Sequence, residues 1–158
     1  MPDISLQLEL ASTADIQQLQ KSALSAFADD VEKYGAFPPN IESTEWFQAE
    51  VSKGNFYKVL YNSDYAGAIC VECGEQSSIE IRYFYIDVEY QNKHIGSQAM
   101  SLIEHQYSHI TNWTLFTPYQ SYRNHHFYEK LGYIKVGEVQ PDQSDDFKLF
   151  EYSKSHLS

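Results

Sequence analysis

The middle of the chain constrains the fold most, because its hydrophobic pattern changes from strand-like to helix-like within a few residues. Three strand-like runs cover Phe56–Tyr61, Tyr65–Cys73 and Ile79–Val88. The polar stretches "NSD" and "GEQSS" separate these runs and are typical of hairpin connections. From the end of "QNKHIGS" onward, starting with its isoleucine, apolar residues recur at helical spacing, at Ile95, Ala99, Leu102, Ile103 and Ile110. The pattern therefore predicts antiparallel strands that lead directly into a helix.

The flanking segments add further strands and helices. Before this region we expect a strand at Leu6–Leu10, a helix from Thr13 to Gly35 after the capping sequence "STAD", and a short helix that starts at Ser43 or Thr44 and ends at Gly54. After it we expect a strand at Asn112–Pro118, a helix at Asn124–Leu131 ended by Gly132, and strands at Tyr133–Val139 and Phe147–Tyr152.

Hairpins thus come early in this order, and strand–helix–strand crossovers come late. A mixed sheet accommodates both kinds of connection, whereas a doubly wound sheet does not. The 158 residues are enough for one domain with one core. We predict a single domain over residues 1–158, of the α/β class (α+β type), with a mostly antiparallel twisted sheet of about six to seven strands and about four helices.

The charge balance limits the partners. The formal net charge is −11, from 22 acidic and 11 basic residues, so the surface repels nucleic-acid phosphates and anionic lipid. No apolar run approaches the roughly 20 residues that cross a bilayer. We expect no nucleic-acid or membrane partner, and a small amine or a basic peptide end is the more natural one. The N-terminus lacks signal-peptide features and there are only two cysteines, so we expect a cytoplasmic protein.

Two spacings imitate a zinc finger: C-x-x-C at Cys70 and Cys73, and H-x-x-x-H at His105 and His109. However, 31 residues lie between the two pairs, against about 12–15 in a zinc site. Strand alternation also predicts that the two cysteines face opposite ways. We therefore expect no metal site. The histidines of the helix face, and also His125 and His126, are expected in solvent rather than at a binding site.

The stretch "QNKHIGS" lies where a strand meets a helix. The first N–H groups of a helix have no partner within it and carry partial positive charge, so they bind anions. Gly96 would let a ligand approach the backbone closely, Ser97 adds a hydroxyl, and Lys93 adds a charge. A polar turn that binds nothing explains the same residues equally well when they are taken alone.

Two segments carry a resemblance to a known family. "FYIDVEYQNKHIGSQAMSLIEHQY" resembles the acetyl-CoA motif of the GNAT N-acetyltransferase superfamily, whose loop reads approximately Q/R-x-x-G-x-G/A. Gln91 and Gly96 match that loop, and His94 stands where its first glycine belongs. Downstream, "NHHFYEKLGYIKVGE" resembles the family's "FYEKLGF" segment. The resemblance covers residues 83–136 and agrees with the order of elements elsewhere.

The resemblance implies direct transfer of the acetyl group of acetyl-CoA to a primary amine, on a small cationic molecule or a peptide. It implies that backbone groups of the strand pair with the cofactor and that the loop amides take its pyrophosphate. An asparagine of the family would fall at Ser121, and Asn124 is the candidate to replace it. The implied cofactor-binding residues are Ile86, Asp87, Val88, Gln91, Asn92, Lys93, His94, Ile95, Gly96, Ser97 and Asn124.

Two residues are candidates for proton transfer. Tyr128 matches the tyrosine that faces the cofactor's sulfur in the family, and a phenol of pKa near 10 can protonate a leaving thiolate. Packing on the core would explain Tyr128 as well. Glu80 is the candidate base for an amine of pKa about 10.4. Alternation places Glu80 and Arg82 on one strand face, so a simple ion pair is an equally good reading. Asp87 and Glu89 are weaker substitutes for Glu80.

Two other functions use the same residues. One is a catalytically idle acetyl-CoA-binding domain, in which the cofactor regulates or stabilises. The other is a protein-interaction domain that binds no cofactor. The identity of the amine does not follow from the residues, and edge strands near the C-terminus are compatible with a homodimer.

Overall fold

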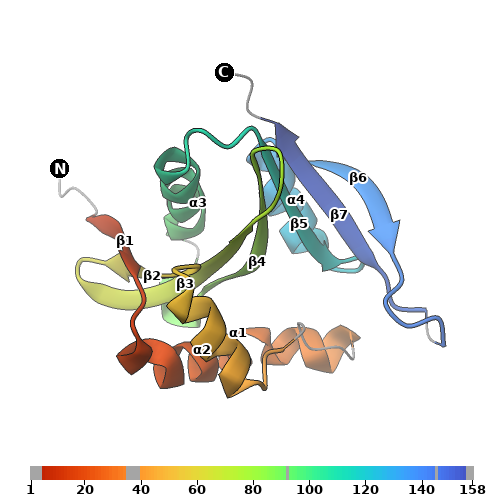
Figure 1. Cartoon of the computed structure of the whole chain (residues 1–158). Helices are drawn as coiled ribbons and strands as arrows, with labels where there is room; N and C mark the ends of the chain where they lie inside the picture. The colour runs from red at the N-terminus through yellow and green to blue at the C-terminus, as the bar shows by residue number, and fades with distance from the viewer. Residues whose placement is uncertain (1–4, 35–39, 92, 145, 156–158) are drawn as a thin grey trace. The chain divides into compact units, whose positions relative to one another are not determined.

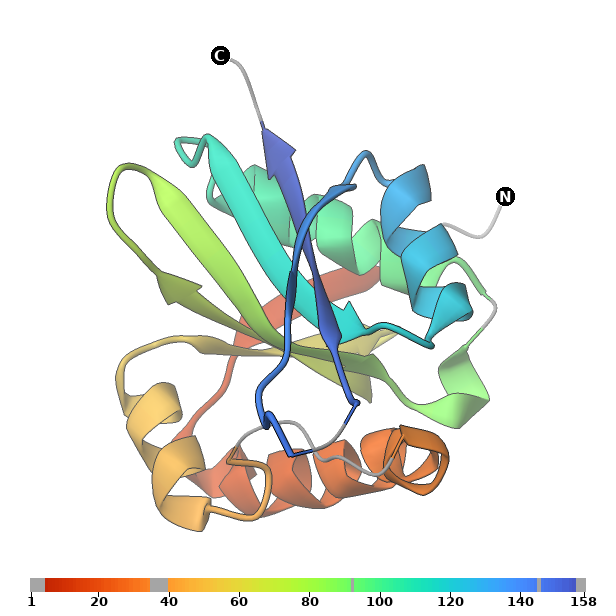
Figure 2. The ribbon, with the colours of Figure 1, turned by 90° about the vertical axis from the view of Figure 1, so that its right-hand side faces the viewer.

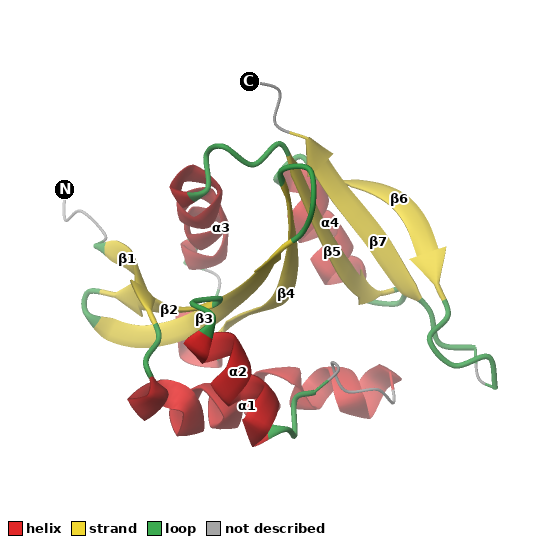
Figure 3. Ribbon diagram, in the orientation of Figure 1, coloured by secondary structure: helices red, strands yellow, loops and turns green. Residues whose placement is uncertain are grey.

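The computed structural model describes residues 5–34, 40–91, 93–144 and 146–155. Its seven-stranded sheet has the order β1-β2-β3-β4-β5-β7-β6 (Figure 3). The pairs β1–β2, β2–β3, β5–β7 and β6–β7 are antiparallel, and β4–β5 is parallel. The predicted mixed, mostly antiparallel sheet is therefore confirmed. The chain divides into two compact units, one comprising residues 1–71 and 83–107, the other 72–82 and 108–158.

The first unit packs helices on both faces of its strands. Figure 1 shows α3 on one face of β1–β3, and α1 with α2 on the other. Its elements are β1 (Leu6–Leu10), α1 (Ile16–Tyr34), α2 (Thr44–Ser52), β2 (Phe56–Tyr61), the larger part of β3 (Asp64–Cys73), the end of β4 (Ser78–Ile86) and α3 (Ile95–Gln106).

Side-chain caps start the two N-terminal helices. The Ser12 N–H donates to Asp15 Oδ2 (2.8 Å), so the aspartate closes the expected capping sequence ahead of the 3₁₀ turn Thr13–Asp15 and α1. The Trp46 N–H donates to Ser43 Oγ (3.1 Å), which identifies Ser43 as the N-cap of α2. Behind these helices, aromatic rings fill the core: Phe47 stacks on Phe56 with ring centroids 5.3 Å apart.

The second unit consists of the end of β3, the start of β4, and the elements β5 (Asn112–Pro118), α4 (Tyr122–Lys130), β6 (Ile134–Val139) and β7 (Leu149–Ser155). The parallel ladder of β4 and β5 runs from Ser78↔Asn112 to Ile81↔Leu115. α4 packs on one face of β5 and β7 (Figure 2). Trp113 and Tyr152 are fully buried there.

Several predicted ends of elements were wrong. β4 ends at Ile86, and Val88 begins a 3₁₀ turn instead of completing the strand. α3 ends at Gln106, so the buried Ile110 lies beyond the helix that was expected to include it. α4 begins at Tyr122 rather than Asn124, and β7 is displaced toward the C-terminus. Gly35, the expected end of the first helix, lies outside the described residues.

Candidate active site

The end of β4 is shaped by a bulge in the neighbouring strand. The β2–β3 register passes from Val59↔Gly67 to Leu60↔Tyr65, which leaves Ala66 as the extra residue. The Asp87 N–H donates to the Ala66 carbonyl oxygen (2.7 Å), and the chain then turns through the 3₁₀ helix Val88–Tyr90. Val88 is thus not in an extended conformation, as its expected pairing with a cofactor would require.

The turn after this strand is closed by Gln91. Its side-chain Nε2 donates to the Ile86 carbonyl oxygen (2.9 Å), so this carbonyl already accepts one hydrogen bond within the protein. The Asp87 carboxyl is half-buried, and its pKa is raised by desolvation and by the nearby charge of Glu89. Asn92, the next candidate, lies outside the described residues.

The N-terminus of α3 presents its first amides without a capping side chain. His94 is the N-cap residue and adopts the left-handed conformation (φ 62°, ψ 13°) that the family's glycine would adopt freely. No residue in the described part of the chain accepts a hydrogen bond from the N–H groups of Ile95, Gly96 or Ser97. The Ser97 hydroxyl donates to the His94 carbonyl oxygen (3.1 Å), and Lys93 and His94 are exposed. These amides and the exposed lysine are donors that fit a diphosphate.

Tyr128 lies on α4, in the second unit, inside an aromatic cluster. Its ring contacts those of Phe127 (5.1 Å between centroids), Tyr133 (5.8 Å) and Tyr152 (6.5 Å), and only 9% of the residue is exposed. Gly132 follows the helix with φ +98°, a conformation that glycine adopts without strain. The Tyr128 ring therefore packs on the core, as one interpretation predicted. This packing is compatible with a catalytic role of the hydroxyl.

Three side chains anchor α4 to the neighbouring strands. Asn124 Nδ2 donates to Thr117 Oγ1 (3.2 Å), the His125 Nε2–H donates to the Pro118 carbonyl oxygen (2.9 Å), and the Tyr152 hydroxyl donates to Glu129 Oε2 (2.8 Å). His125 was expected in solvent, and this was wrong: the residue is buried, and its ring stacks on Phe150 with centroids 5.0 Å apart.

The contacts of α4 also bear on the N-cap of this helix and on the pKa of the Tyr152 phenol. Ser121 is the buried N-cap of α4 but makes no side-chain capping bond, and Asn124, the candidate cofactor contact, donates its amide to Thr117. Desolvation, together with the hydrogen bond to Glu129 and its charge, raises the pKa of Tyr152 to about 12. Tyr152 therefore stays protonated at neutral pH and acts as a hydrogen-bond donor.

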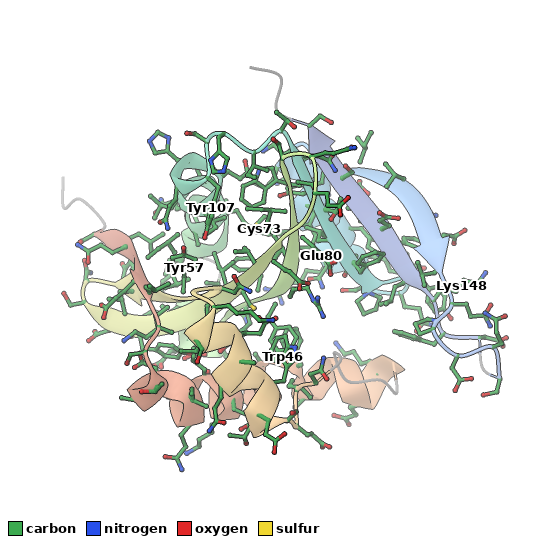
Figure 4. The ribbon with its side chains drawn as sticks, viewed as in Figure 1. Trp46, Tyr57, Cys73, Glu80, Tyr107 and Lys148 are labelled. Atoms are coloured by element: carbon green, nitrogen blue, oxygen red, sulfur yellow. The ribbon has the colours of Figure 1, made fainter. Side chains whose placement is uncertain are left out.

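Glu80 extends from β4 (Figure 4) and lies close to Arg82, as the ion-pair reading predicted. Arg82 Nε is 3.5 Å from Glu80 Oε2, while Arg82 Nη1 donates to Glu72 Oε2. Desolvation raises the pKa of the Glu80 carboxyl, and the charges of Glu72 and Glu151 raise it further, against the lowering effect of Arg82. A carboxylate with a raised pKa is a better proton acceptor near neutral pH.

The sheet register places Glu80 and Tyr128 on opposite faces within the second unit. Thr117, which contacts α4, shares its strand face with Leu115, the partner of Ile81. Glu80 is the partner of Thr114 and therefore points to the other face. The paired backbone of β4 and β5 therefore lies between the two side chains at the level of Glu80.

The sequence did not identify Glu72 as a neighbour of Glu80, although the register of the predicted hairpin would have placed the two residues opposite each other. The Gly74 N–H donates to the Ser78 carbonyl oxygen (2.9 Å) and closes the turn. Two residues further along each antiparallel strand, Glu72 and Glu80 then lie level with each other.

The remaining candidates stay apart from these groups. Cys70 is buried and Cys73 exposed, as alternation predicted, and His105 and His109 are exposed. Over the described residues, no three His, Cys, Asp or Glu side chains come together as a metal site would require. Nor does any helix in this part of the chain have the length and apolarity to cross a membrane.

Comparison with known proteins identifies the family. Residues 52–135, just over half of the chain, match the acetyltransferase (GNAT) domain. The uncharacterized protein YrkN of Bacillus subtilis (strain 168) is 32% identical over 134 residues, covering 80% of this chain and 71% of that protein.

Solved structures show the same fold. PaiA N-acetyltransferase from Thermoplasma acidophilum, in complex with coenzyme A, aligns with a TM-score of 0.74 at 20% identity over 96% of this chain and 99% of that chain. Arabidopsis thaliana Naa50, in complex with the bisubstrate analogue CoA-Ac-MVNAL, aligns with a TM-score of 0.74 at 17% identity over 96% and 99%. The expected fold class and enzyme class are thereby confirmed, and the chain belongs to the GNAT family of acetyltransferases.

Proposed function

We propose that this enzyme acetylates a primary amine on a small cationic molecule or a peptide, with Tyr128 as general acid and Glu80 as general base. The observation that carries this proposal is the open N-terminus of α3. The N–H groups of Ile95, Gly96 and Ser97 have no acceptor among the described residues, and they directly follow the turn that ends β4. A helix start of this kind binds a diphosphate through its amides and its dipole.

Bound acetyl-CoA would supply an activated acetyl thioester. The amides of α3 and the Lys93 ammonium would bind its diphosphate, and the backbone at Ile86 and Asp87, where β4 ends, would orient its pantetheine arm. Gln91, Asn92 and His94 are further candidate contacts in the first unit, and Asn124 is a separate candidate in the second unit. His94 stands where the family has a glycine. Its backbone is left-handed, as a glycine's can be, so we expect the loop to have the same backbone conformation as in the family.

Two proton transfers accompany the acetyl transfer. The incoming amine is mostly protonated at neutral pH, and Glu80 accepts the proton that it must lose. The sulfur that leaves the acetyl group needs a proton, which the Tyr128 hydroxyl donates.

Charge favours a cationic acceptor. The net charge of −11 attracts amines, and the Glu80 side chain lies near two further carboxylates, Glu72 and Glu151. A peptide amine is supported by the bisubstrate analogue CoA-Ac-MVNAL bound to Naa50 of Arabidopsis thaliana.

Two measurements test the proposal. Calorimetry with acetyl-CoA reports cofactor binding, and thiol release with polyamines, aminoglycosides and short peptides reports transfer. We expect turnover with at least one amine. Cofactor binding without turnover on any of these amines would favour the idle binding domain, and a lack of binding would refute the diphosphate site.

Tyr128→Phe separates the proposed acid from its packing role. It removes only the hydroxyl, so turnover should fall at least about tenfold while acetyl-CoA affinity changes little. Tyr122→Phe is a matched control, since Tyr122 lies on the same helix and is 77% exposed. Equal turnover in the two variants would remove Tyr128 from the mechanism.

Gly96→Leu tests the diphosphate site itself. A side chain at Gly96 would occupy space at the helix N-terminus, so acetyl-CoA affinity should fall. Gln98→Leu, at an exposed position of the same helix, is the control and should bind acetyl-CoA normally. Wild-type affinity in the Gly96 variant would contradict the site.

A further inference from the structure

Arg82 lies close to two carboxylates, Glu72 and Glu80, and its contact with Glu72 is the shorter one. Its Nη1 donates to Glu72 Oε2, whereas its Nε approaches Glu80 Oε2 only to 3.5 Å. All three side chains are partly exposed, with 42% of Glu72, 27% of Arg82 and 37% of Glu80 accessible. Arg82 Nη1 is therefore directed to Glu72, and the contact of the guanidinium with the candidate base is the longer one.

This unequal arrangement has a chemical consequence. A guanidinium can donate two parallel hydrogen bonds to a single carboxylate, which occupies the carboxylate lone pairs and stabilises its charged form. Such a clamp on Glu80 would make it a poor proton acceptor. Glu72, opposite Glu80 in the hairpin, is the described group that takes Nη1 instead.

We propose that Glu72 is a positioning residue for the acetyl-transfer reaction: by binding Arg82 Nη1, it holds the guanidinium back from Glu80 and leaves that carboxylate available to accept the proton of the amine. This inference rests on the proposed role of Glu80 as the base. It assigns to the ion pair Glu72–Arg82 a function beyond the stability of the hairpin.

The other groups around Glu80 agree with this assignment. Thr114 of β5 is its neutral neighbour across the parallel ladder, and Glu151 of β7 contributes a second negative charge. Burial, Glu72 and Glu151 all raise the pKa of Glu80, and among the described residues Arg82 on the same strand is the cation that lowers it. The balance therefore depends on where the Arg82 guanidinium points.

Carboxyl ¹³C NMR titration of the full chain tests the proposal without relying on activity. The Glu80 resonance is assigned by its loss in Glu80→Gln. In Glu72→Gln, Arg82 should turn to Glu80, so the titration midpoint of Glu80 should fall by roughly half a unit or more. Glu151→Gln removes a charge of the same sign but leaves the Arg82 ion pair, and it should lower the midpoint less. Glu72→Asp keeps the carboxylate and should restore most of the wild-type midpoint.

Kinetics with an accepted amine complete the test. Glu72→Gln should move the acidic limb of the kcat/KM profile to lower pH and reduce kcat at its plateau, with acetyl-CoA affinity unchanged. Equal midpoint shifts in Glu72→Gln and Glu151→Gln, or no shift in either, would overturn the positioning role while Glu80 remained the base. Full activity of Glu80→Gln would instead overturn the base itself, and the role of Glu72 with it.

Discussion

Gly67 is the position where a single methyl group should disturb the candidate site most. A Cβ built on Gly67 of β3 would lie 2.1 Å from the Tyr85 carbonyl oxygen and 3.0 Å from the Ile86 Cα, both backbone atoms of β4, whereas ordinary contacts are 3.4–4 Å. Neither atom can move aside as a flexible side chain would. Gly67→Ala must therefore displace β4 by about 1 Å or more, at the strand end that leads into the acetyl-CoA loop.

The expected cost lies at the upper end of that for overpacked cores, at about 3 kcal/mol of unfolding free energy. Two glycines provide matched controls. Gly54 has φ +77° and nothing within 4 Å of its added Cβ, so Gly54→Ala should cost about 1 kcal/mol for backbone strain alone. Gly137 would meet the movable Glu151 side chain at 3.3 Å, so Gly137→Ala should change stability by less than about 0.5 kcal/mol.

Urea unfolding of the three variants measures these differences, provided that the m-values stay equal. Calorimetry at a temperature where all three are folded should then find weaker acetyl-CoA binding for Gly67→Ala alone. If Gly67→Ala is as stable as Gly137→Ala and binds acetyl-CoA normally, the close approach of β3 and β4 is wrong, and so is our account of how the bulge positions the loop.

Three further changes test individual contacts. Ser43→Ala removes the cap that binds the Trp46 N–H and should cost about 1 kcal/mol in urea unfolding. His94→Gly relieves a left-handed backbone and should raise stability by up to about 1 kcal/mol without weakening acetyl-CoA binding; a loss of affinity would show that the imidazole contacts the cofactor. Desolvation would raise the pKa of Asp15, but its hydrogen bonds with Ser12 and its ion pair with Lys58 outweigh this effect and hold the pKa below its usual value. A lowered folded-state pKa contributes stability that is complete above the unfolded-state pKa of about 3.9 and disappears as the pH falls through the folded-state pKa, so Asp15→Asn should destabilise the protein at about pH 7 but hardly at about pH 2.

Hydrophobic periodicity predicted the order of elements well, because it records which face of each strand or helix is buried. The alternation of Ile79, Ile81, Tyr83 and Tyr85, all buried, identifies β4 without knowledge of its neighbours. Periodicity failed where the backbone conformation depends on a hydrogen bond to a residue far away in the sequence. On the other face, Val88 continues the apolar series of Phe84 and Ile86, yet it leaves the strand because the Asp87 N–H binds the bulged Ala66 on β3.

The candidate site shows the same division. The helix start at residues 94–97 was predictable, since a local sequence creates both its amides and its turn. The environments of His125 and Glu72 were not predicted, because each depends on a residue of a different element of the fold. His125 has the polarity of a surface residue, but its hydrogen bond to the Pro118 carbonyl and the stacking of its ring on Phe150 make burial favourable. For Glu72, the partner Arg82 became visible only through the hairpin register.

That register also explains why the candidate acid and the candidate base lie on different faces of the second unit. Side chains alternate between the two faces of a strand, so the pairing of Ile81 with Leu115 alone decides that Glu80 points away from α4 and its Tyr128. A slip of one residue between β4 and β5 would turn Glu80 toward the buried aromatic cluster and expose Ile79 and Ile81. The burial of two isoleucines and of Trp113 opposes such a slip, at about 1.5–3 kcal/mol for each large apolar side chain. The same apolar contacts that hold the second unit together therefore determine which face carries the base, so substitutions that weaken this ladder should impair proton transfer from the amine before they impair acetyl-CoA binding at α3.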